Sequence, residues 1–265
     1  MSNWFSMAGR RALVTGGSMS IGRAIALGFA DHGASVAIHH SRAADEAFGL
    51  PDAADETLAA VRARGAESCL IEADLATEGG GRLAVERAIA EMGGVDVLVV
   101  CASVQTRTPF VEVTVAEMQR QFDINFRATV ELLQAALPPM AARNWGRALT
   151  IGSINQLRPV PDLAVYAALK SAQQNLCRNL AREYAGRNVM INNLAPGLVA
   201  TERNRWRRED VAGWQRIQAK AAAPIGRAAR PDEMVGAAIL LCSEAASYIA
   251  GADVMVTGGA HLPGL

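Results

Sequence analysis

Lysine is almost absent from this chain, and there is no net charge. Among 265 residues only Lys170 and Lys220 are lysine, so arginine supplies nearly all of the positive charge. The 26 basic and 26 acidic side chains cancel, which leaves no overall field that would attract nucleic acid or a membrane surface. We therefore expect neither as a partner, and the rarity of lysine draws attention to Lys170.

Cysteines and long apolar runs are also scarce. The start of the chain lacks the apolar core of a signal peptide, and no apolar run is long enough to span a bilayer. The cysteines are far apart in apolar surroundings, which fits neither a disulfide framework nor a zinc site. We expect reduced, buried thiols, no metal site and a cytoplasmic location. The four cysteines are Cys69, Cys101, Cys177 and Cys242.

A glycine-rich loop near the amino terminus is the first motif. An apolar run at residues 11–14 leads into Thr15-Gly16-Gly-Ser-Met-Ser-Ile-Gly22, and an amphipathic segment follows at 23–32. In the order strand, loop and helix, these glycines predict a dinucleotide pyrophosphate at the helix N-terminus. Gly16 would allow the tight turn, and Gly22 would let the helix pack closely. Taken alone, the loop is better explained as an ordinary turn.

Apolar and amphipathic segments alternate along the rest of the chain. This alternation predicts an α/β fold with a doubly wound parallel sheet, and ligand binding at the carboxyl ends of the strands. Pro138-Pro139 should disturb the end of a long helix. Without any linker, we predict one domain over residues 1–265. Further strands are predicted at 33–42, 68–72, 95–100, 147–153, 189–194 and 253–256, and helices at 53–64, 83–92, 115–137, 166–184 and 231–241.

Residues 201–223 differ in composition from the rest of the chain. They contain several arginines together with Trp206 and Trp214, and they show no strand pattern. We predict a mobile helical lid over the strand ends that covers the substrate. The alternative is an arginine-rich pair of helices on the solvated surface.

The polar end of the second predicted strand bears on the choice of cofactor. An acidic residue here would bind the 2′-hydroxyl of NAD, but none occurs before Asp45. His40, Ser41 and Arg42 stand there instead, and arginine is well suited to hold a 2′-phosphate. We therefore predict NADP(H) as the favoured cofactor, with NAD(H) possible. Arg42 could also be an ordinary loop residue.

Tyr166 and Lys170 form the strongest candidate for chemistry. They are four residues apart at the start of a predicted helix, so they share one face. Ser153 ends an apolar run thirteen residues earlier. A hydroxyl at a strand end that faces a tyrosine and a lysine is a plausible proton-donating site, although most tyrosine and lysine pairs of this spacing lie on the solvated surface.

In these motifs the chain resembles the classical short-chain dehydrogenase/reductase family, over essentially its whole length. The resemblance implies a Rossmann-like sheet of about seven parallel strands, a nicotinamide cofactor and a homotetramer. It also implies a catalytic set of Ser153, Tyr166 and Lys170 with Asn125 as a helper that positions a water. The matching residues, all in the family's order, are Thr15, Gly16, Gly22, Asp74, Asn125, Ser153, Tyr166, Lys170, Asn192, Pro196, Gly197 and Thr201.

The resemblance also implies roles in binding. Lys170 would hold the hydroxyls of the nicotinamide ribose, and Thr201 would bind the carboxamide. We predict that the substrate contacts Gln105, Asn155, Gln156 and Trp206. The predicted cofactor-binding residues are Gly16, Ser18, Ser20, Ile21, Gly22, Ser41, Arg42, Asp74, Leu75, Ala102, Tyr166, Lys170, Pro196, Gly197, Val199 and Thr201.

Three positions depart from the family pattern. Ser20 replaces the middle glycine of the first loop, and Thr257 replaces an aspartate before the final Gly-Gly. Residues 100–103, Val-Cys-Ala-Ser, replace Asn-Asn-Ala-Gly after the fourth strand, and Cys101 there is best interpreted as a small buried apolar residue. The changes at Ser20 and at residues 100–103 affect close backbone contacts near the cofactor. The predicted catalytic set is nevertheless complete.

The predicted function is an NAD(P)(H)-dependent oxidoreductase that interconverts a secondary alcohol and a carbonyl. The Lys170 ammonium would favour the phenolate of Tyr166, which would exchange a proton with the substrate oxygen, and Ser153 would hydrogen-bond that oxygen. The substrate could be a ketoacyl group or a sugar or polyol. A different class remains open, namely a non-catalytic dinucleotide sensor or scaffold on the same fold.

Overall fold

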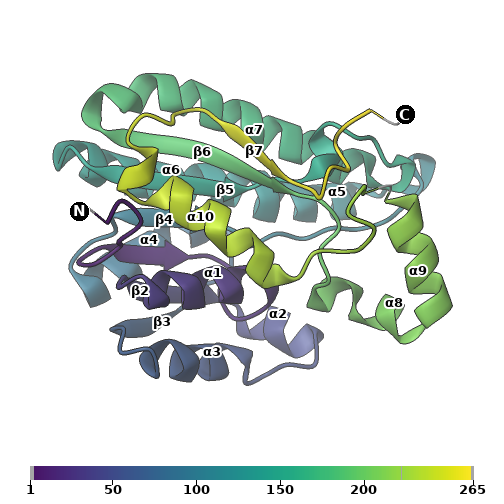
Figure 1. Cartoon of the computed structure of the whole chain (residues 1–265), viewed down its shortest axis with the longest axis horizontal. Coiled ribbons are helices and arrows are strands. Elements are labelled where there is room, and N and C mark those ends of the chain that lie inside the picture. The colour runs from purple at the N-terminus through teal and green to yellow at the C-terminus, as the bar shows by residue number, and fades with distance from the viewer. Residues whose placement is uncertain (1–2, 222, 264–265) are drawn as a thin grey trace.

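A computed structural model describes residues 3–221 and 223–263. Its centre is a single sheet of seven parallel strands in the order β3-β2-β1-β4-β5-β6-β7 (Figure 1). The doubly wound parallel sheet predicted from the sequence is confirmed. The strands are β1 (Arg11–Val14), β2 (Ser35–His40), β3 (Ser68–Glu72), β4 (Val97–Val100), β5 (Gly146–Ile151), β6 (Val189–Pro196) and β7 (Asp253–Val256).

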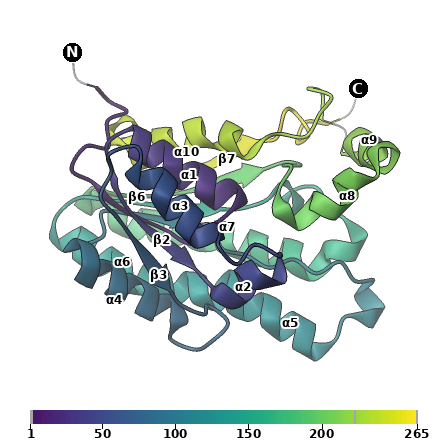
Figure 2. The same ribbon diagram turned by 90° about the horizontal axis from the view of Figure 1, so that it is seen from below.

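Helices cover both faces of the sheet, because its central strands are apolar on both sides. One apolar layer lies between the sheet and α1, α3 and α10, and the other lies between the sheet and α4, α6 and α7 (Figure 2). All of β4 and β6 is buried. The helices of these layers are α1 (Ser20–Asp31), α3 (Ala53–Arg62), α4 (Gly80–Met92), α6 (Ala128–Ala142), α7 (Ala164–Tyr184) and α10 (Val235–Cys242).

The strand order places a ligand site at the carboxyl ends of the strands, which is called the carboxyl edge of the sheet below. β1 pairs with β2 on one side and with β4 on the other, so the direction of winding reverses at β1. In open parallel sheets the carboxyl ends of the strands at such a reversal form a crevice that binds ligands. The loops after β1, β4, β5 and β6, which carry most of the predicted site residues, all emerge at this edge.

The long helix predicted at 115–137 is different in two respects. It consists of α5 (Val115–Phe122), one π-helical turn η2 (Asp123–Arg127) and α6, which continues to Ala142. The prediction that Pro138-Pro139 would disturb the helix end was wrong, because both prolines lie within α6. Leu137 and Met140 of this last turn are buried in the core, and this packing outweighs the local cost of proline.

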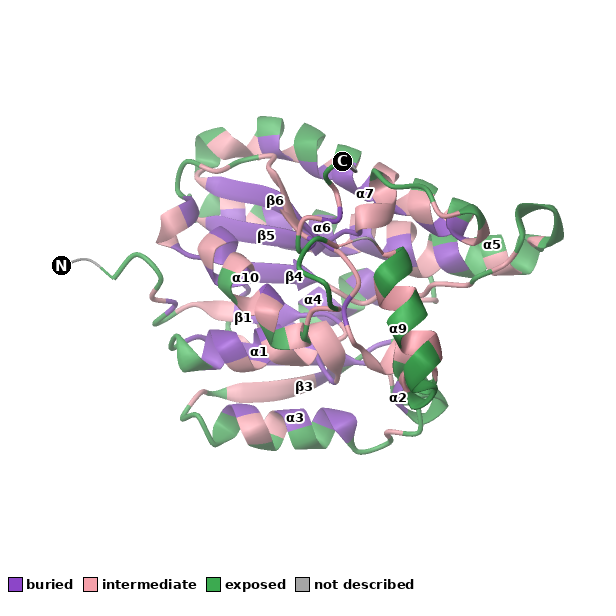
Figure 3. Cartoon of the chain, turned by 45° about the vertical axis from the view of Figure 1, so that its right-hand side comes forward, coloured by how far each residue is buried: buried purple, intermediate pink, exposed green. Residues whose placement is uncertain are grey.

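Two short helical regions flank the carboxyl edge. A helix at α2 (Arg42–Ala47), not predicted from the sequence, begins at Arg42. The predicted lid contains a 3-10 turn η6 (Glu202–Asn204), α8 (Arg205–Glu209) and α9 (Val211–Lys220), which stand beside the sheet and are largely exposed (Figure 3). Ala222 of the predicted lid lies outside the described residues, as do residues 1–2 and 264–265 of the predicted domain.

All four cysteines are free thiols. Cys177 and Cys242 are buried as predicted, whereas Cys69 and Cys101 are only partly covered. Burial raises the pKa of the Cys177 thiol to about 11, so this thiol stays protonated at neutral pH. Among the described helices none has the length and apolarity needed to cross a bilayer. The described residues contain no group of histidine, cysteine and acidic side chains suited to a metal ion.

Candidate active site

The glycine loop between β1 and α1 has the shape of an anion cradle. Gly16 adopts a φ of 61°, and a Cβ atom added to it would lie 3.0 Å from the Cα of Ala102. A Cβ on Gly22 would lie 2.0 Å from the carbonyl oxygen of Gly16, so the close approach is to the loop itself. No side chain caps the N-terminus of α1, and no acidic residue stands in its first turn. Its free N–H groups therefore fit a pyrophosphate.

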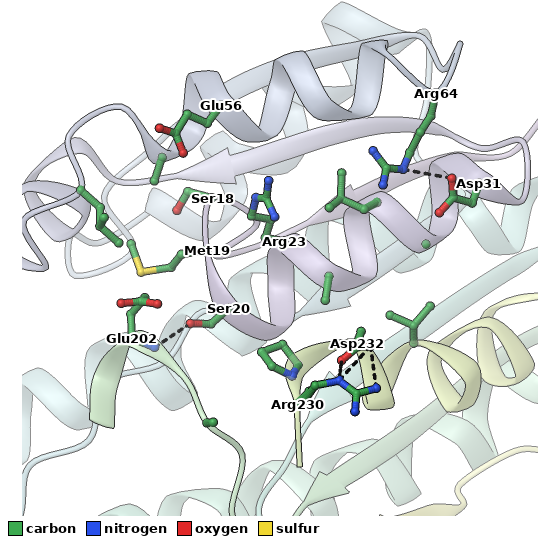
Figure 4. Close-up of a pocket in the computed structure, with 18 of the residues that line it drawn as sticks. Ser18, Met19, Ser20, Arg23, Asp31, Glu56, Arg64, Glu202, Arg230 and Asp232 are labelled. Carbon is green, nitrogen blue, oxygen red and sulfur yellow. Dashed lines mark hydrogen bonds and ion pairs between the residues drawn. The ribbon is translucent and has the colours of Figure 1, made fainter. Parts of the chain in front are cut away.

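Ser20, which replaces a family glycine, connects this loop to the predicted lid. Its φ of 53° lies in the left-handed region, where a residue other than glycine costs about 1 kcal/mol. Its hydroxyl oxygen accepts a hydrogen bond of 3.0 Å from the backbone N–H of Glu202 (Figure 4). The serine thus joins two segments that are remote in sequence.

The acidic residue nearest the predicted ribose site is turned inward. Asp45 is 2% exposed, and its carboxylate accepts a hydrogen bond of 2.7 Å from the hydroxyl of Ser18. The other carboxylate oxygen lies 3.4 Å from Nδ1 of His40. Arg42, in contrast, is exposed. Its Nε lies 3.7 Å from a carboxylate oxygen of Glu72, and a surface ion pair of this kind holds the guanidinium weakly.

The other predicted cofactor residues gather at the same edge of the sheet. Asp74 and Leu75 follow β3, Ser41 follows β2, and Ile21 lies in the first turn of α1. The backbone N–H of Ala102 donates to Thr15 Oγ1 at 3.1 Å. After β6, a Cβ on Gly197 would lie 3.0 Å from the Cα of Thr257, so these segments need glycine to approach. The remaining three are Pro196 at the end of β6, Val199 in a bridge to Ala229, and Thr201 at the N-cap of η6.

The three predicted catalytic residues are buried beside the carboxyl end of β5. Ser153, Tyr166 and Lys170 are 8%, 5% and 2% exposed. The Ser153 hydroxyl oxygen accepts a hydrogen bond of 3.2 Å from the N–H of Asn155. The Lys170 ammonium donates to the carbonyl oxygen of Ile151 at 2.7 Å and lies 5.8 Å from the centre of the Tyr166 ring.

Gln173 is a neighbour of the site that the sequence argument missed. It is 1% exposed, and its Oε1 accepts a hydrogen bond of 3.0 Å from Lys170. Burial lowers the pKa of Lys170, and the charge of Arg203 adds to this, whereas Tyr166 acts in the opposite direction. An acceptor such as Gln173 stabilises the charged ammonium. Its position three residues after Lys170, on the same helix face, was the available signal.

Asn125 holds the loop after β4. Its Oδ1 accepts a hydrogen bond of 2.9 Å from the N–H of Val104, and its Nδ2 donates to the carbonyl oxygen of Val104 at 2.8 Å. The residue is 1% exposed and lies in the π-helical turn η2. Each polar atom of the side chain therefore makes one hydrogen bond to the backbone of Val104, and the positioning of a water by Asn125 stays a prediction.

The predicted substrate residues are divided between the site and its surroundings. Gln105 is partly buried in the loop after β4, and Asn155 directly contacts Ser153. The amide of Gln156 donates instead to Asp253 at 2.6 Å, so it connects the loop after β5 to β7. Trp206 is 64% exposed, and the guanidinium of Arg207 lies 4.8 Å from the centre of its ring.

A cavity of about 860 Å³ lies on the outer side of the glycine loop rather than at Tyr166. It extends between α1, the start of α3, the first residues of the lid and the turn η7 (Pro231–Met234) (Figure 4). Ser18 and Ser20 line it, but none of the three predicted catalytic residues does. It borders the cofactor region and is distinct from the crevice at the end of β5.

Comparison with known proteins agrees with this geometry. A family model described as Enoyl-(Acyl carrier protein) reductase matches residues 16–261. Dehydrogenase/reductase SDR family member 4 of Bos taurus is 34% identical over 252 residues, which cover 94% of this chain and 86% of that protein.

Two solved structures illustrate the similarity in three dimensions. A 3-oxoacyl (acyl-carrier-protein) reductase from Agrobacterium tumefaciens C58 with NADP bound has a TM-score of 0.90 and 43% identity, and the match covers 96% of this chain and 95% of that one. A gluconate 5-dehydrogenase from Burkholderia cenocepacia J2315 in complex with NADP and tartrate has a TM-score of 0.87 and 31% identity, with 99% of each chain covered. The chain therefore belongs to the short-chain dehydrogenase/reductase family of NAD(P)-dependent oxidoreductases.

Proposed function

We propose that this oxidoreductase interconverts a secondary alcohol and a carbonyl in a sugar, a polyol or a sugar acid. The observation that carries the proposal is the buried group of Ser153, Tyr166 and Lys170 at the carboxyl end of β5. The structural relative that is named a gluconate 5-dehydrogenase supports this substrate class. The partly buried polar residues Gln105 and Asn155 beside the site are suited to hydroxyl groups.

A ketoacyl thioester is the second candidate substrate. It is favoured by the 43% identity to a structure named a 3-oxoacyl (acyl-carrier-protein) reductase. Both candidates require the same reaction at the reacting carbon, and they differ in the remainder of the molecule that the lid must cover.

The proposed mechanism assigns one task to each catalytic residue. The nicotinamide supplies or accepts the hydride when it is bound. Tyr166 gives a proton to the carbonyl oxygen during reduction and takes it back during oxidation. Because the oxygen of Ser153 already accepts from Asn155, its own proton is directed to the substrate oxygen. Lys170 places its positive charge 5.8 Å from the centre of the Tyr166 ring, on the side where negative charge develops as the phenol gives up its proton.

Asn125 has a positioning task in this proposal. Its amide holds Val104 from both sides, which fixes the loop between β4 and the substrate. Its backbone carbonyl accepts a hydrogen bond of 2.9 Å from Thr129. Thr129 is 3.5 Å from Gln173 and thereby connected to Lys170.

The favoured cofactor in this proposal is NADP(H). Asp45, the first acidic residue after β2, is engaged by Ser18, whereas Arg42 is exposed and weakly paired with Glu72. Several structural relatives are described with bound NADP, including the two compared above. The free N-terminus of α1 would bind the pyrophosphate, and Thr201, Val199 and the turn at Pro196 and Gly197 would bind the nicotinamide end.

We also propose a homotetramer of single-domain subunits in the cytoplasm. Residues 201–223 form the lid in this proposal. Apolar side chains project from the turn η1 (Phe110–Glu112) and from α5, which is the kind of surface that subunit contacts cover. They are Phe110, Val111, Val115, Met118 and Phe122, which are 40–91% exposed.

A cofactor-oxidation screen tests the proposed function. The purified chain would be mixed with NADPH or NADH and with keto sugars, keto sugar acids, aldoses or ketoacyl thioesters, and the loss of cofactor absorbance would be followed. We expect turnover of a keto sugar or keto sugar acid, faster with NADPH. Turnover of thioesters alone would favour the second candidate. Tight NADPH binding without any turnover would instead favour the alternative that the protein is a non-catalytic dinucleotide sensor.

A further inference from the structure

One arginine of the lid is fixed at the active-site edge of the sheet. Nη2 of Arg203, in the turn η6, donates to the carbonyl oxygen of Ser103 at 2.8 Å and to its hydroxyl oxygen at 2.9 Å. Ser103 is the third residue after β4, and β4 pairs with β5. Ser153 lies just beyond the end of β5, and the carbonyl oxygen of Ile151 in β5 accepts a hydrogen bond from Lys170. The guanidinium is therefore held on the catalytic side.

Arg203 has no acidic partner among the described residues. In the described part of the chain, no carboxylate oxygen lies within 4.0 Å of its guanidinium, whereas Arg205 and Arg208 share Glu202 and Arg216 faces Asp210. Ser103 accepts hydrogen bonds from Nη2 alone. Within residues 3–221 and 223–263, neither Nε nor Nη1 of Arg203 donates a hydrogen bond to the protein. These two nitrogens of a partly buried side chain are donors that an anionic ligand could use in a charge-assisted hydrogen bond.

The charge of Arg203 reaches into the site. The pKa of Lys170 is lowered first by burial and then by the charge of Arg203. Burial raises the pKa of the Cys101 thiol to about 11, and Lys170 and Arg203 oppose that rise. These directions agree with the contact between Arg203 and Ser103, two residues after Cys101.

Further positive charge surrounds the mouth of the site. Arg207 lies one helical turn after Arg203, and its pKa is lowered by burial and then by the charge of Arg107. Arg107 is paired with Asp162 at 2.7 and 2.8 Å. Asp162 is thus the carboxylate that acts on both Arg107 and Arg207, and the positive charge of Arg203 adds to theirs, which would favour an anionic ligand.

We propose that Arg203 binds a carboxylate of the substrate, so that the substrate is a hydroxy or keto acid rather than a neutral sugar. This inference rests on the proposed function and makes it more specific. Arginine binds carboxylates through two parallel N–H donors, and Nε and Nη1 remain for that purpose while Nη2 stays on Ser103. Arg203 is then a specificity-determining residue, and Ser103 is its positioning residue.

The position of Ser103 favours the substrate over the cofactor pyrophosphate as the anion. The pyrophosphate has its own donors at the N-terminus of α1. Ala102 lies against Gly16 of that loop, and Ser103 is one residue further along the chain, toward Val104 and Asn125. The charge of Arg203 also acts on Lys170, so an anion bound by Arg203 would lie within reach of the charge of the catalytic lysine.

The test compares acids with their uncharged amides in the full-length protein. Keto sugar acids and their amides, which differ only in the charged group, would be assayed with NADPH for wild type, Arg203→Gln and Arg203→Lys. We expect wild type to prefer the acid, and Arg203→Gln to lower kcat/KM for the acid by about 30-fold, mainly through KM, with little change for the amide. Arg203→Lys should be intermediate. Arg82→Gln, at an exposed arginine of α4 outside the lid, is the matched control and should behave as wild type.

A binding measurement separates this inference from the proposed function. Calorimetry would give the affinity of NADP⁺ for each variant, and of gluconate for each enzyme–NADP⁺ complex. We expect unchanged NADP⁺ affinity and loss of gluconate binding in Arg203→Gln, and this result would support the anion site even without turnover. An equal loss for acid and amide, weaker NADP⁺ binding in Arg203→Gln, or no gluconate binding by wild type would overturn the inference. In the last case, turnover of neutral sugars would leave the proposed function intact.

Discussion

The two ends of the sheet use arginine in opposite ways. At the amino end, Arg147 of β5 is fully buried and donates to the carbonyl oxygens of Gly146, Asn188 and Ser243 at 2.8–3.1 Å. Trp145 stacks near it, with its ring centre 4.5 Å from the guanidinium. At the carboxyl end, Arg203 is fixed by one serine and keeps two nitrogens for another partner.

A second contrast concerns carboxylates. At the amino end, Asp96 accepts hydrogen bonds from Nε of Arg11 at 2.8 Å and from Arg143 at 3.2 Å, so charges there are neutralised within the protein. At the carboxyl end, the described residues give Arg203 no carboxylate. The difference indicates that the amino end stabilises the fold and that the carboxyl end leaves its charges for ligands. Substitutions should therefore separate stability from activity.

The largest effect on stability is expected at Arg147. Arg147→Ala would remove three side-chain hydrogen bonds to backbone carbonyl oxygens and create a cavity in place of a fully buried side chain, which we expect to lower the free energy of unfolding by about 4 kcal/mol. Urea denaturation followed by circular dichroism would measure this loss. Arg216→Ala, at an exposed pair, should change the free energy of unfolding by less than about 0.5 kcal/mol. Similar losses in both variants would refute the structural role of Arg147.

The largest effect on activity is expected at Tyr166. Tyr166→Phe removes only the proposed proton donor, and we expect kcat to fall by at least about a hundredfold, equivalent to about 2.7 kcal/mol. The affinity for NADPH, measured by fluorescence titration, and the melting temperature should stay close to wild type. Turnover near the wild-type value would exclude Tyr166 as the acid–base group.

Asp96 should make the amino end sensitive to acid. Burial acts to raise the pKa of Asp96, but the hydrogen bonds and charge of Arg11 lower it overall. Because the folded-state pKa is below that of the unfolded chain, the stabilisation is present above the ordinary value of about 3.9 and is lost as the pH falls through the folded-state pKa.

The corresponding variant is Asp96→Asn. We expect it to lose about 2 kcal/mol of stability at neutral pH and to show a smaller further loss between neutral and acidic pH than wild type does. Denaturation curves over that pH range would test this, with kcat at neutral pH as the measure of the intact carboxyl end. An unchanged pH dependence in the variant would contradict the assigned role.

The smallest of these effects is expected for cofactor choice at Arg42. Arg42→Asp should remove the partner of the 2′-phosphate and offer an acceptor to the 2′-hydroxyl of NADH, which we expect to shift the ratio of kcat/KM values by about tenfold or more toward NADH. Arg64→Asp, in a surface pair between the turn after α3 and the last residue of α1, serves as the control. Equal ratios for wild type and Arg42→Asp would show that Arg42 does not contact the phosphate.

Much of the fold could be predicted because the strands are short, mainly apolar runs that alternate with amphipathic segments. The bounds of β3 and β7 are those read from the sequence, and α7 ends at the predicted Tyr184. Such patterns are local, and a strand buried on both faces needs continuous apolar residues wherever it lies in the sheet. The break at η2 and the continuation of α6 through Pro138-Pro139 were missed, because packing around Asn125 and Met140 decides them.

The sequence by itself determined the family, the order of the elements and the Ser153, Tyr166 and Lys170 set, since these depend on residue types at short spacings. Only the tertiary structure decided which neighbours each side chain meets: Asp45 turned toward Ser18, Ser20 bound to Glu202, and Arg203 bound to Ser103. The last two contacts join residues 182 and 100 positions apart. No local pattern encodes such a contact, because it exists only once the strands are assembled and their carboxyl ends share one edge.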